Sequence, residues 1–225
     1  MDQIERFIGG FRHFRRHYFE NAPQLYNRLK DGQNPNCLVI GCCDSRVNPV
    51  HLFDCEPGEI FIMRNVANLV PPQCSDGPQG VLAAIEYAVC GLHVSDAIVL
   101  GHSHCGGIQA LMQRGSAAAH RQKEGRDAHG GGQHLERWLD VAEPVRQRIL
   151  AQMPAASEQE RCRACEQAAI LASLENLRAM DCVRERMAAG ALRLHGWYFD
   201  LEAGQLHTWS PRAGAFLATD QAQQP

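Results

Sequence analysis

Residues 39–46 read VIGCCDSR, and they join an apolar strand to a set of reactive side chains. The apolar, β-branched beginning is typical of a strand buried in a sheet. Alternate residues of an extended chain share a face, so Cys42, Asp44 and Arg46 are predicted to project together and Cys43 to the other side. If a metal lies at this strand end, we expect Cys42 to be its ligand and Cys43 to be a packing residue.

A second stretch of the same kind, VLGHSHCGG, occupies residues 99–107. Its spacing lets His102, at the end of a strand, and Cys105, at the start of a helix, converge on one point. Adjacent side chains diverge, so His104 is the weaker candidate ligand. The positive end of a helix dipole at Cys105 favours the thiolate form that binds metals.

Strand and helix patterns alternate between and beyond these two stretches, which indicates an α/β fold. We expect a mostly parallel central sheet flanked by helices, ending in an antiparallel strand pair joined through residues 202–204. The expected strands are residues 38–41, 59–64, 97–101, 192–200 and 205–210, and the expected helices are 80–89, 106–113 and 158–189. Ligands of such sheets bind beyond the carboxyl ends of the strands, where both reactive stretches lie.

Two thiolates and one imidazole form a donor set that suits zinc, and three protein ligands leave one position for water. The alternative is a closed structural site in which a further cysteine or Asp44 is the fourth ligand. Arg46 favours the open site, because its guanidinium can hold Asp44 ionised and away from the metal through paired hydrogen bonds.

The N-terminal segment has aromatic residues at helical spacing, Phe7, Phe11, Phe14 and Tyr18. This helix either packs on the core of its own chain or lies across a second subunit. We expect residues 1–34 to form a helical arm, residues 35–219 one α/β zinc domain, and residues 220–225 a tail.

Composition places the chain among cytoplasmic globular proteins. It has 225 residues, 45% of them hydrophobic, and a formal net charge of −3, which gives no reason to expect nucleic acid or membrane partners. No apolar run approaches the ~20 residues of a membrane-spanning helix, and no signal-peptide core is visible. Ten cysteines in a chain of this length therefore indicate reduced thiols or metal ligands.

Two further groups of metal-binding residue types are open to two interpretations. Residues 114–134 form a glycine-rich polar loop whose His120, His129 and His134 are either solvated or a second chelating group. Cys162 and Cys165 form a C-x-x-C pair within a helical pattern, and either pack in the core or form a second metal or redox site.

The two reactive stretches together resemble the paired signatures of the β-class carbonic anhydrases. The resemblance extends over about residues 33–200 apart from the glycine-rich loop, and is closer to the plant-type branch than to the regulated bacterial branch. The motifs that carry it are GCCDSRV, EPGEIFIMRNVANLVPP, AAIEYAV, GHSHCGG and HGWYFD.

The resemblance implies a function and roles for individual residues. It implies reversible hydration of carbon dioxide to bicarbonate by a zinc-bound hydroxide that the pair Asp44 and Arg46 orients. The implied zinc ligands, one ion per subunit, are Cys42, His102 and Cys105. The implied carbon dioxide pocket, partly contributed by a neighbouring subunit, comprises Gln33, Phe61, Val66, Tyr87 and Gly106. Family members are dimers or larger assemblies whose N-terminal helices embrace the partner, so a homodimer or tetramer is expected.

Two other functions remain compatible with the same residues. The fold and ligands would also serve hydrolysis of carbon disulfide or carbonyl sulfide. A zinc-stabilised binding protein without activity is the second alternative.

In the regulated branch, a second bicarbonate ion is held by a tryptophan, an arginine and a tyrosine. This chain has Val39, Arg64 and Phe199 at those positions. Tyr198 is one position away but is predicted to point to the opposite face of its strand. We therefore expect an open site without that form of regulation.

Overall fold

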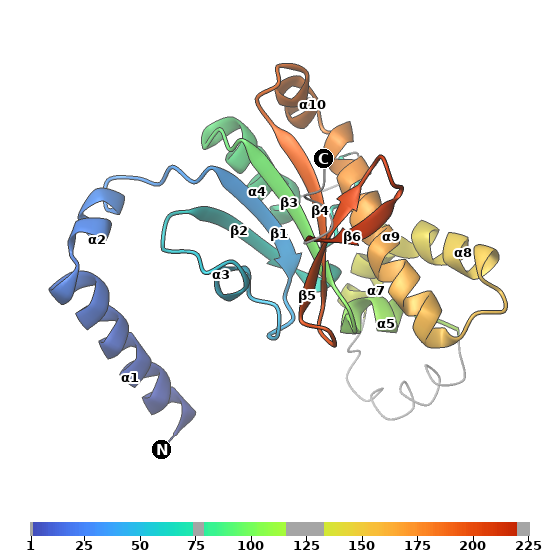
Figure 1. Cartoon of the computed structure of the whole chain (residues 1–225), viewed down its shortest axis with the longest axis horizontal. Helices are drawn as coiled ribbons and strands as arrows, with labels where there is room; N and C mark the ends of the chain where they lie inside the picture. Colours follow the sequence, from blue (N-terminus) through green and yellow to red (C-terminus); the bar gives the residue numbers. More distant parts are fainter. Residues whose placement is uncertain (1, 74–78, 116–132, 220–225) are drawn as a thin grey trace.

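A computed structural model describes residues 2–73, 79–115 and 133–219, and its centre is a six-stranded sheet (Figure 1). The order β2-β1-β3-β4-β5-β6 is parallel over its first four strands and antiparallel from β4 to β6. The predicted α/β fold is confirmed, and β6 is an additional strand. The strands are β1 Cys37–Cys42, β2 Ile60–Asn65, β3 Asp96–His102, β4 Arg193–Asp200, β5 Gln205–Ser210 and β6 Ala215–Ala218.

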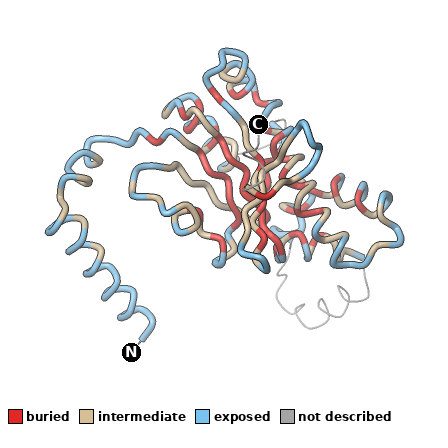
Figure 2. The backbone as a smooth tube through the Cα atoms, in the orientation of Figure 1, coloured by how far each residue is buried: buried red, intermediate tan, exposed pale blue. Residues whose placement is uncertain are grey.

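Helices cover both faces of this sheet. They are needed there because β1 and β3 carry apolar side chains on both of their faces. On β1, Leu38 and Ile40 belong to a core under α4 and η3, whereas Val39 packs on the opposite side with Leu52 of α3. Figure 2 shows the buried backbone concentrated in these central strands and in the helices beside them. The α-helices are α1 Gln3–Arg15, α2 Gln24–Leu29, α3 Pro49–Leu52, α4 Gly80–Glu86, α5 Gly106–Met112, α7 Gln133–Leu139, α8 Glu143–Gln152, α9 Glu158–Ala179 and α10 Asp181–Ala188. The π-helical segments are η1 Arg16–Asn21 and η3 Tyr87–Gly91, and the 3₁₀ segments are η2 Val66–Asn68 and η4 Asp140–Ala142.

The helix expected over residues 158–189 is two helices in the structure. A capping box of Ser157 and Glu160 begins α9, and both of its reciprocal hydrogen bonds are present. Met180 is extended, with φ −69° and ψ 130°, so the chain changes direction before α10. No helix in the described ranges is long and apolar enough to cross a membrane.

The N-terminal arm projects from the body of the molecule (Figure 1). No residue of α1 is buried, and Phe7 and Phe11 are among its exposed apolar side chains. Phe14 and Tyr18 instead form a small ring cluster with Tyr26 of α2. The alternative that this helix packs on the core of its own chain is therefore wrong for the single chain.

Two expected segments fall largely outside the described residues. These are positions 116–132 of the glycine-rich loop, with His120 and His129, and the tail 220–225. His134 is described, and it lies in the first turn of α7. Of the C-x-x-C pair, Cys165 is fully buried in the core and Cys162 is partly exposed.

Candidate metal centre

Three predicted ligands meet at the carboxyl edge of the sheet because β1 and β3 are parallel neighbours. Cys42 ends β1, His102 ends β3, and Cys105 occupies the position before α5. All three are buried, and their ligand atoms lie within 4.8 Å of one another. The two sulfur atoms are 4.0 Å apart. Two sulfurs on a tetrahedral zinc, each ~2.3 Å from the metal, would be about 3.8 Å apart, so the residues fit zinc.

The imidazole of His102 is held in the tautomer that a metal ligand needs. Its Nδ1 lies 2.8 Å from the carbonyl oxygen of Ser103, and this geometry suits donation from an Nδ1–H group. The other nitrogen, Nε2, is buried and makes no hydrogen bond. A buried nitrogen without a partner is costly unless its lone pair binds a metal.

The two thiols differ in acidity when no cation lies between them. Hydrogen bonding with Cys105 lowers the pKa of Cys42 to about 4 against the opposing effect of burial. The same contact with Cys42, together with burial, raises the pKa of Cys105 far above its usual value. Two adjacent thiolates repel each other, so only one ionises readily until a metal ion neutralises both.

Asp44 and Arg46 form a tight ion pair at the edge of this centre. Arg46 donates from Nε to Oδ1 of Asp44 at 2.9 Å and from Nη2 to Oδ2 at 2.7 Å. These hydrogen bonds hold the pKa of Asp44 well below its usual range. Oδ2 of Asp44 lies 3.9 Å from Nε2 of His102, so the ionised carboxylate borders the ligand set.

The reason for this placement differs from the predicted one. The alternation of side chains along a strand accounts for the two cysteines: Cys42 is 5% exposed, and Cys43 is exposed. It does not place Asp44 and Arg46, because β1 ends at Cys42 and both residues lie beyond the strand. Arg46 reaches Asp44 through a local turn, in which its backbone N–H also donates to Oδ1 at 3.0 Å.

Sequence reasoning named Arg64 only for its position in the regulated branch, and it missed that this residue holds the turn against the sheet. Arg64 of β2 donates from Nε to the carbonyl oxygen of Cys42 and from Nη2 to that of Asp44, both at 2.7 Å. A longer bond of 3.4 Å reaches the carbonyl oxygen of Val47. One guanidinium therefore fixes the backbone that carries both a ligand and the carboxylate.

A buried carboxylate behind the centre was also missed. Glu166 of α9 is 5% exposed, and it accepts hydrogen bonds from the backbone N–H of Cys105 at 3.0 Å and from the hydroxyl of Tyr198 at 2.8 Å. Burial raises its pKa against the effect of these bonds. No motif marks this glutamate, because only the packing of α9 on β3 and β4 brings it to the centre.

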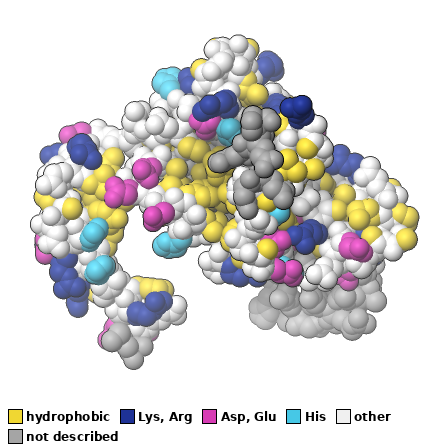
Figure 3. Space-filling model, in the orientation of Figure 1, with side chains coloured by type: hydrophobic (Ala, Val, Ile, Leu, Met, Phe, Trp, Pro, Cys, Tyr) yellow, Lys and Arg dark blue, Asp and Glu magenta, His cyan; other side chains and the backbone are white. Residues whose placement is uncertain are grey.

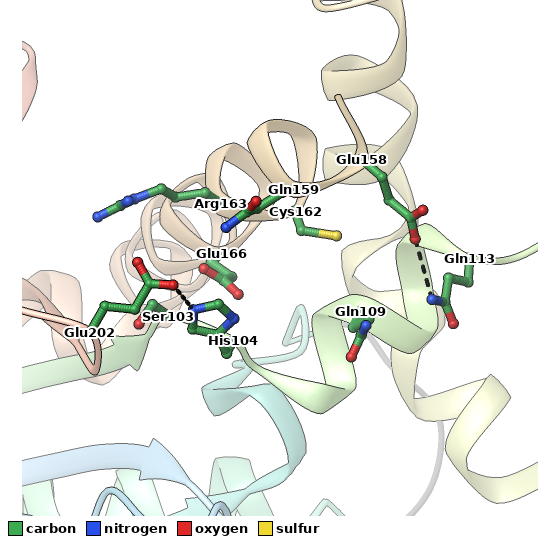
Figure 4. A pocket seen from close by; sticks show the side chains of 10 residues that line it. All are labelled: Ser103, His104, Gln109, Gln113, Glu158, Gln159, Cys162, Arg163, Glu166 and Glu202. Carbon is green, nitrogen blue, oxygen red and sulfur yellow. Dashed lines mark hydrogen bonds and ion pairs between the residues drawn. The ribbon is translucent and has the colours of Figure 1, made fainter. Parts of the chain in front are cut away.

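Glu166 also borders a cavity of about 410 Å³ (Figure 4). His104 points into this cavity and pairs with Glu202 at 2.7 Å. The expectation that His104 diverges from the ligands agrees with this geometry. The lining residues are Ser103, His104, Gln109, Gln113, Glu158, Gln159, Cys162, Arg163, Glu166 and Glu202.

The five residues expected to bind substrate come from four separate stretches of the chain. Phe61 and Tyr87 form a ring pair with centroids 5.8 Å apart, and Tyr87 is 52% exposed. Val66 lies against α5, whose Gly107 has no room for a Cβ because the Val66 side chain would be 2.7 Å away. Gly106 is the exposed first residue of α5, and Gln33 is exposed between α2 and β1.

The family model described as carbonic anhydrase matches residues 37–206. Beta carbonic anhydrase 3 of Arabidopsis thaliana is 37% identical over 209 residues, which cover 93% of this chain and 78% of that protein. The structure of the β-carbonic anhydrase CcaA superposes with a TM-score of 0.86 at 30% identity and covers 96% of this chain and 100% of its own. The structure of a tetrameric β-carbonic anhydrase of Sordaria macrospora superposes with a TM-score of 0.75 at 28% identity. It covers 92% of this chain and 95% of its own.

These similarities agree with the donor set found at the end of the sheet. Cys42, His102 and Cys105 form the metal-binding cluster of the described residues, and zinc, one ion per chain, is its metal. The chain belongs to the β-class carbonic anhydrases.

Proposed function

We propose that this protein hydrates carbon dioxide reversibly to bicarbonate and a proton. The observation that carries the proposal is the ionised Asp44 carboxylate, which Arg46 holds beside a buried Cys-His-Cys set. Zinc, when bound there, supplies Lewis-acid activation, because it lowers the pKa of water enough to give a nucleophile near neutral pH.

The roles of the surrounding side chains follow from their hydrogen bonds. Arg46 occupies both oxygens of Asp44, which keeps the carboxylate ionised and fixes its direction. Oδ2 of Asp44 then accepts the remaining hydrogen of the attacking oxygen, so that a lone pair faces the carbon of carbon dioxide. His102 and Cys105 are held in turn by Ser103 and Glu166, which limits movement of the ligand set.

The substrate pocket is proposed to consist of Phe61, Val66, Tyr87 and Gly106, with Gln33 supplied by a neighbouring subunit. Apolar side chains suit a small molecule without charge. Gln33 lies in the exposed stretch of the arm between α2 and β1, which fits a residue that serves another chain.

We also propose that the active form is a homodimer or tetramer of the cytoplasm. The exposed aromatic side chains of the arm need a covering surface, and a second copy of the domain supplies one. The structural relatives from Sordaria macrospora are described as tetrameric. Reduced thiols at Cys42 and Cys105, which the metal requires, fit the cytoplasm.

Stopped-flow measurement of carbon dioxide hydration with a pH indicator tests the proposal. The zinc-loaded protein is expected to accelerate hydration by orders of magnitude over buffer. The matched control is the Cys42→Ser variant, which lacks one of the three zinc ligands. Turnover of carbonyl sulfide or carbon disulfide with no carbon dioxide hydration would indicate the hydrolase alternative. Zinc binding with no turnover of any of the three would indicate a binding protein.

A further inference from the structure

Arg46 has an anchor besides Asp44, and this anchor belongs to the turn between β3 and α5. Both hydrogens of its Nη2 are used. One goes to Oδ2 of Asp44 at 2.7 Å, and the other goes to the backbone carbonyl oxygen of His104 at 3.0 Å. The direction of the Asp44 carboxylate therefore depends on where the His104 carbonyl group points.

The backbone at His104 has a conformation that needs support. Its φ is 56°, in the left-handed region that glycine adopts freely and other residues adopt rarely. The peptide that follows it joins the acceptor of Arg46 to a metal ligand, because its N–H group belongs to Cys105. Glu166 accepts a hydrogen bond from that N–H group at 3.0 Å, which holds the Cys105 end of the peptide. The His104 end needs a contact of its own to stay in this conformation.

The imidazole of His104 makes such a contact. Its Nε2 donates to Oε1 of Glu202 at 2.7 Å, from the β3–α5 turn to the turn between β4 and β5 (Figure 4). The two side chains are 45% and 58% exposed, so the pair adds little to the free energy of unfolding. Its effect is expected on the local geometry of the turn and not on the stability of the fold.

The turn that carries Glu202 is itself fixed. Oδ1 of the buried Asp200 accepts hydrogen bonds from the backbone N–H of Glu202 at 2.9 Å and from that of the next residue at 3.3 Å. The two turns are also joined directly, because Leu201 donates its backbone N–H to Oγ of Ser103 at 2.8 Å. Glu202 is therefore an anchor that is held in place relative to the sheet.

We propose that Glu202 and His104 are positioning residues for the pair of Asp44 and Arg46. Glu202 holds the imidazole, the His104 carbonyl oxygen stays in line with Nη2 of Arg46, and Arg46 keeps the carboxylate directed at the attacking oxygen. This inference rests on the proposed hydration reaction, in which that direction matters in the attack step. Loss of the contact should therefore lower kcat and kcat/KM by the same factor and leave KM unchanged.

The first test measures carbon dioxide hydration by the full-length, zinc-loaded protein, with rates expressed per bound zinc. Glu202→Ala removes the acceptor and is expected to lower kcat about 3- to 10-fold, which corresponds to the loss of one hydrogen bond. Glu202→Gln, whose amide oxygen can still accept from Nε2, should recover most of this loss. His104→Gly keeps the left-handed backbone without strain but has no imidazole, so it should lose as much as Glu202→Ala.

The matched control is Glu158→Ala. It removes another exposed glutamate that borders the same cavity and pairs with a neighbouring side chain, and it should keep the wild-type kcat. The thermal unfolding midpoint of Glu202→Ala should also equal that of the wild type, which separates positioning from a purely structural role.

A double substitution tests whether the effect passes through Arg46. In the Arg46→Ala background, adding Glu202→Ala should lower kcat less than about twofold, because the group through which Glu202 acts is already gone. An equal loss in both backgrounds would overturn the proposal.

NMR gives a measurement that does not need turnover. The Nε–H signal of Arg46, assigned by its loss in Arg46→Lys, should exchange with water several-fold faster in Glu202→Ala and His104→Gly than in the wild type and Glu158→Ala. Wild-type exchange in Glu202→Ala, or wild-type kcat in that variant, would overturn the proposal. A wild-type protein without hydration activity would refute the proposed function instead, and the exchange rates would still show whether Glu202 holds Arg46.

Discussion

At the end of β1 the chain presents Cys42 to the buried centre and Cys43 to solvent. The Cys42 sulfur lies 4.0 Å from that of Cys105, and the backbone N–H of Asp44 points at it from 3.4 Å. Chemically identical neighbours therefore differ entirely in what they can bind. The opposite directions of two successive side chains at the strand end make Cys42 a metal ligand and leave Cys43 a surface thiol.

We predict that Cys42→Ser abolishes zinc binding and that Cys43→Ser leaves it nearly intact. Serine removes the thiolate that zinc prefers, and a site of two remaining ligands cannot retain the ion. Elemental analysis of the dialysed proteins gives zinc per chain, with about one ion expected for the wild type. Equal loss of zinc in the two variants would contradict the assignment.

A second substitution separates metal binding from the role of the ion pair. Asp44→Asn should keep its zinc, because Cys42, His102 and Cys105 remain, but should lose activity by about 100-fold or more. An amide can donate toward the attacking oxygen and misorient it, and it attracts Arg46 far less. The measurement is carbon dioxide hydration beside zinc content, and unchanged turnover at alkaline pH would refute the role.

These residues show how far sequence reasoning reaches at this scale. The three ligands and the ion pair were predictable, because each lies at a strand end or within four residues after it, and the chemistry of the side chains is distinctive. Arg64 and Glu166 were not predictable as parts of the centre. Their contacts with Cys42 and Cys105 depend on which strands and helices become neighbours, and local spacing does not contain that information.

Among the elements, β1, β2 and β4 carry the three residues that determine whether a second bicarbonate could bind beside the centre. Val39 and Phe199 pack together in one apolar cluster, where the regulated branch has polar aromatic donors. Tyr198 is fully buried in the cluster on the other face, so the predicted orientation is confirmed. Arg64 already donates to the carbonyl oxygens of Cys42 and Asp44.

We therefore predict that bicarbonate does not inhibit this protein cooperatively. A buried bicarbonate would lack two hydrogen-bond donors, and each unsatisfied partner costs about 1–3 kcal/mol. Activity should fall smoothly as the proton concentration rises, in initial-rate measurements across pH at several bicarbonate concentrations. Steep loss of activity below about pH 8 with bicarbonate stabilising the inactive form would contradict this expectation, as would a crystal with Asp44 bound to zinc.

The contact between β4 and α9 leads to a prediction about stability. Tyr198→Phe removes the hydroxyl that donates to Oε2 of Glu166 at 2.8 Å inside the core. The carboxylate then loses a buried partner, so the free energy of unfolding should fall by about 1–3 kcal/mol. Urea denaturation measures this change, and Tyr18→Phe in η1, which is only partly buried, is the control with no expected loss. Equal stability of the two variants would show that Glu166 needs no donor from β4.

Element boundaries were less predictable than the elements themselves. The alternation of strands and helices indicated the sheet, but not the break at Met180 or the additional strand β6. Met180 ends α9 because its extended backbone cannot continue the helix, and its side chain is 3% exposed in the core. A buried apolar residue at a break keeps the helical hydrophobic pattern, so periodicity alone does not show the interruption.

At the scale of the whole molecule, the single chain leaves an apolar surface uncovered. Figure 3 shows hydrophobic side chains along the side of the arm that faces the body across an open hollow. The exposed apolar side chains of the arm are Ile4, Phe7, Ile8, Phe11 and Phe19. Monomeric proteins seldom leave such a set in water, so a covering surface from another chain is expected.

The last prediction is that Phe11→Asp separates the assembly into single chains. Phe11 is 62% exposed in one chain, and burying its ring in an interface contributes about 1.5–3 kcal/mol for each arm. An aspartate there would also bring an unpaired charge into apolar surroundings. Light scattering coupled to size exclusion measures the mass, and Arg12→Ala on the same helix is the control that should keep the oligomer.

Zinc should remain at one ion per chain in the variant, because Cys42, His102 and Cys105 all come from one chain. Activity should fall together with the mass, since the proposed pocket needs Gln33 of a neighbouring subunit. An unchanged mass would refute the role of the arm, and full activity in a single chain would refute a shared pocket.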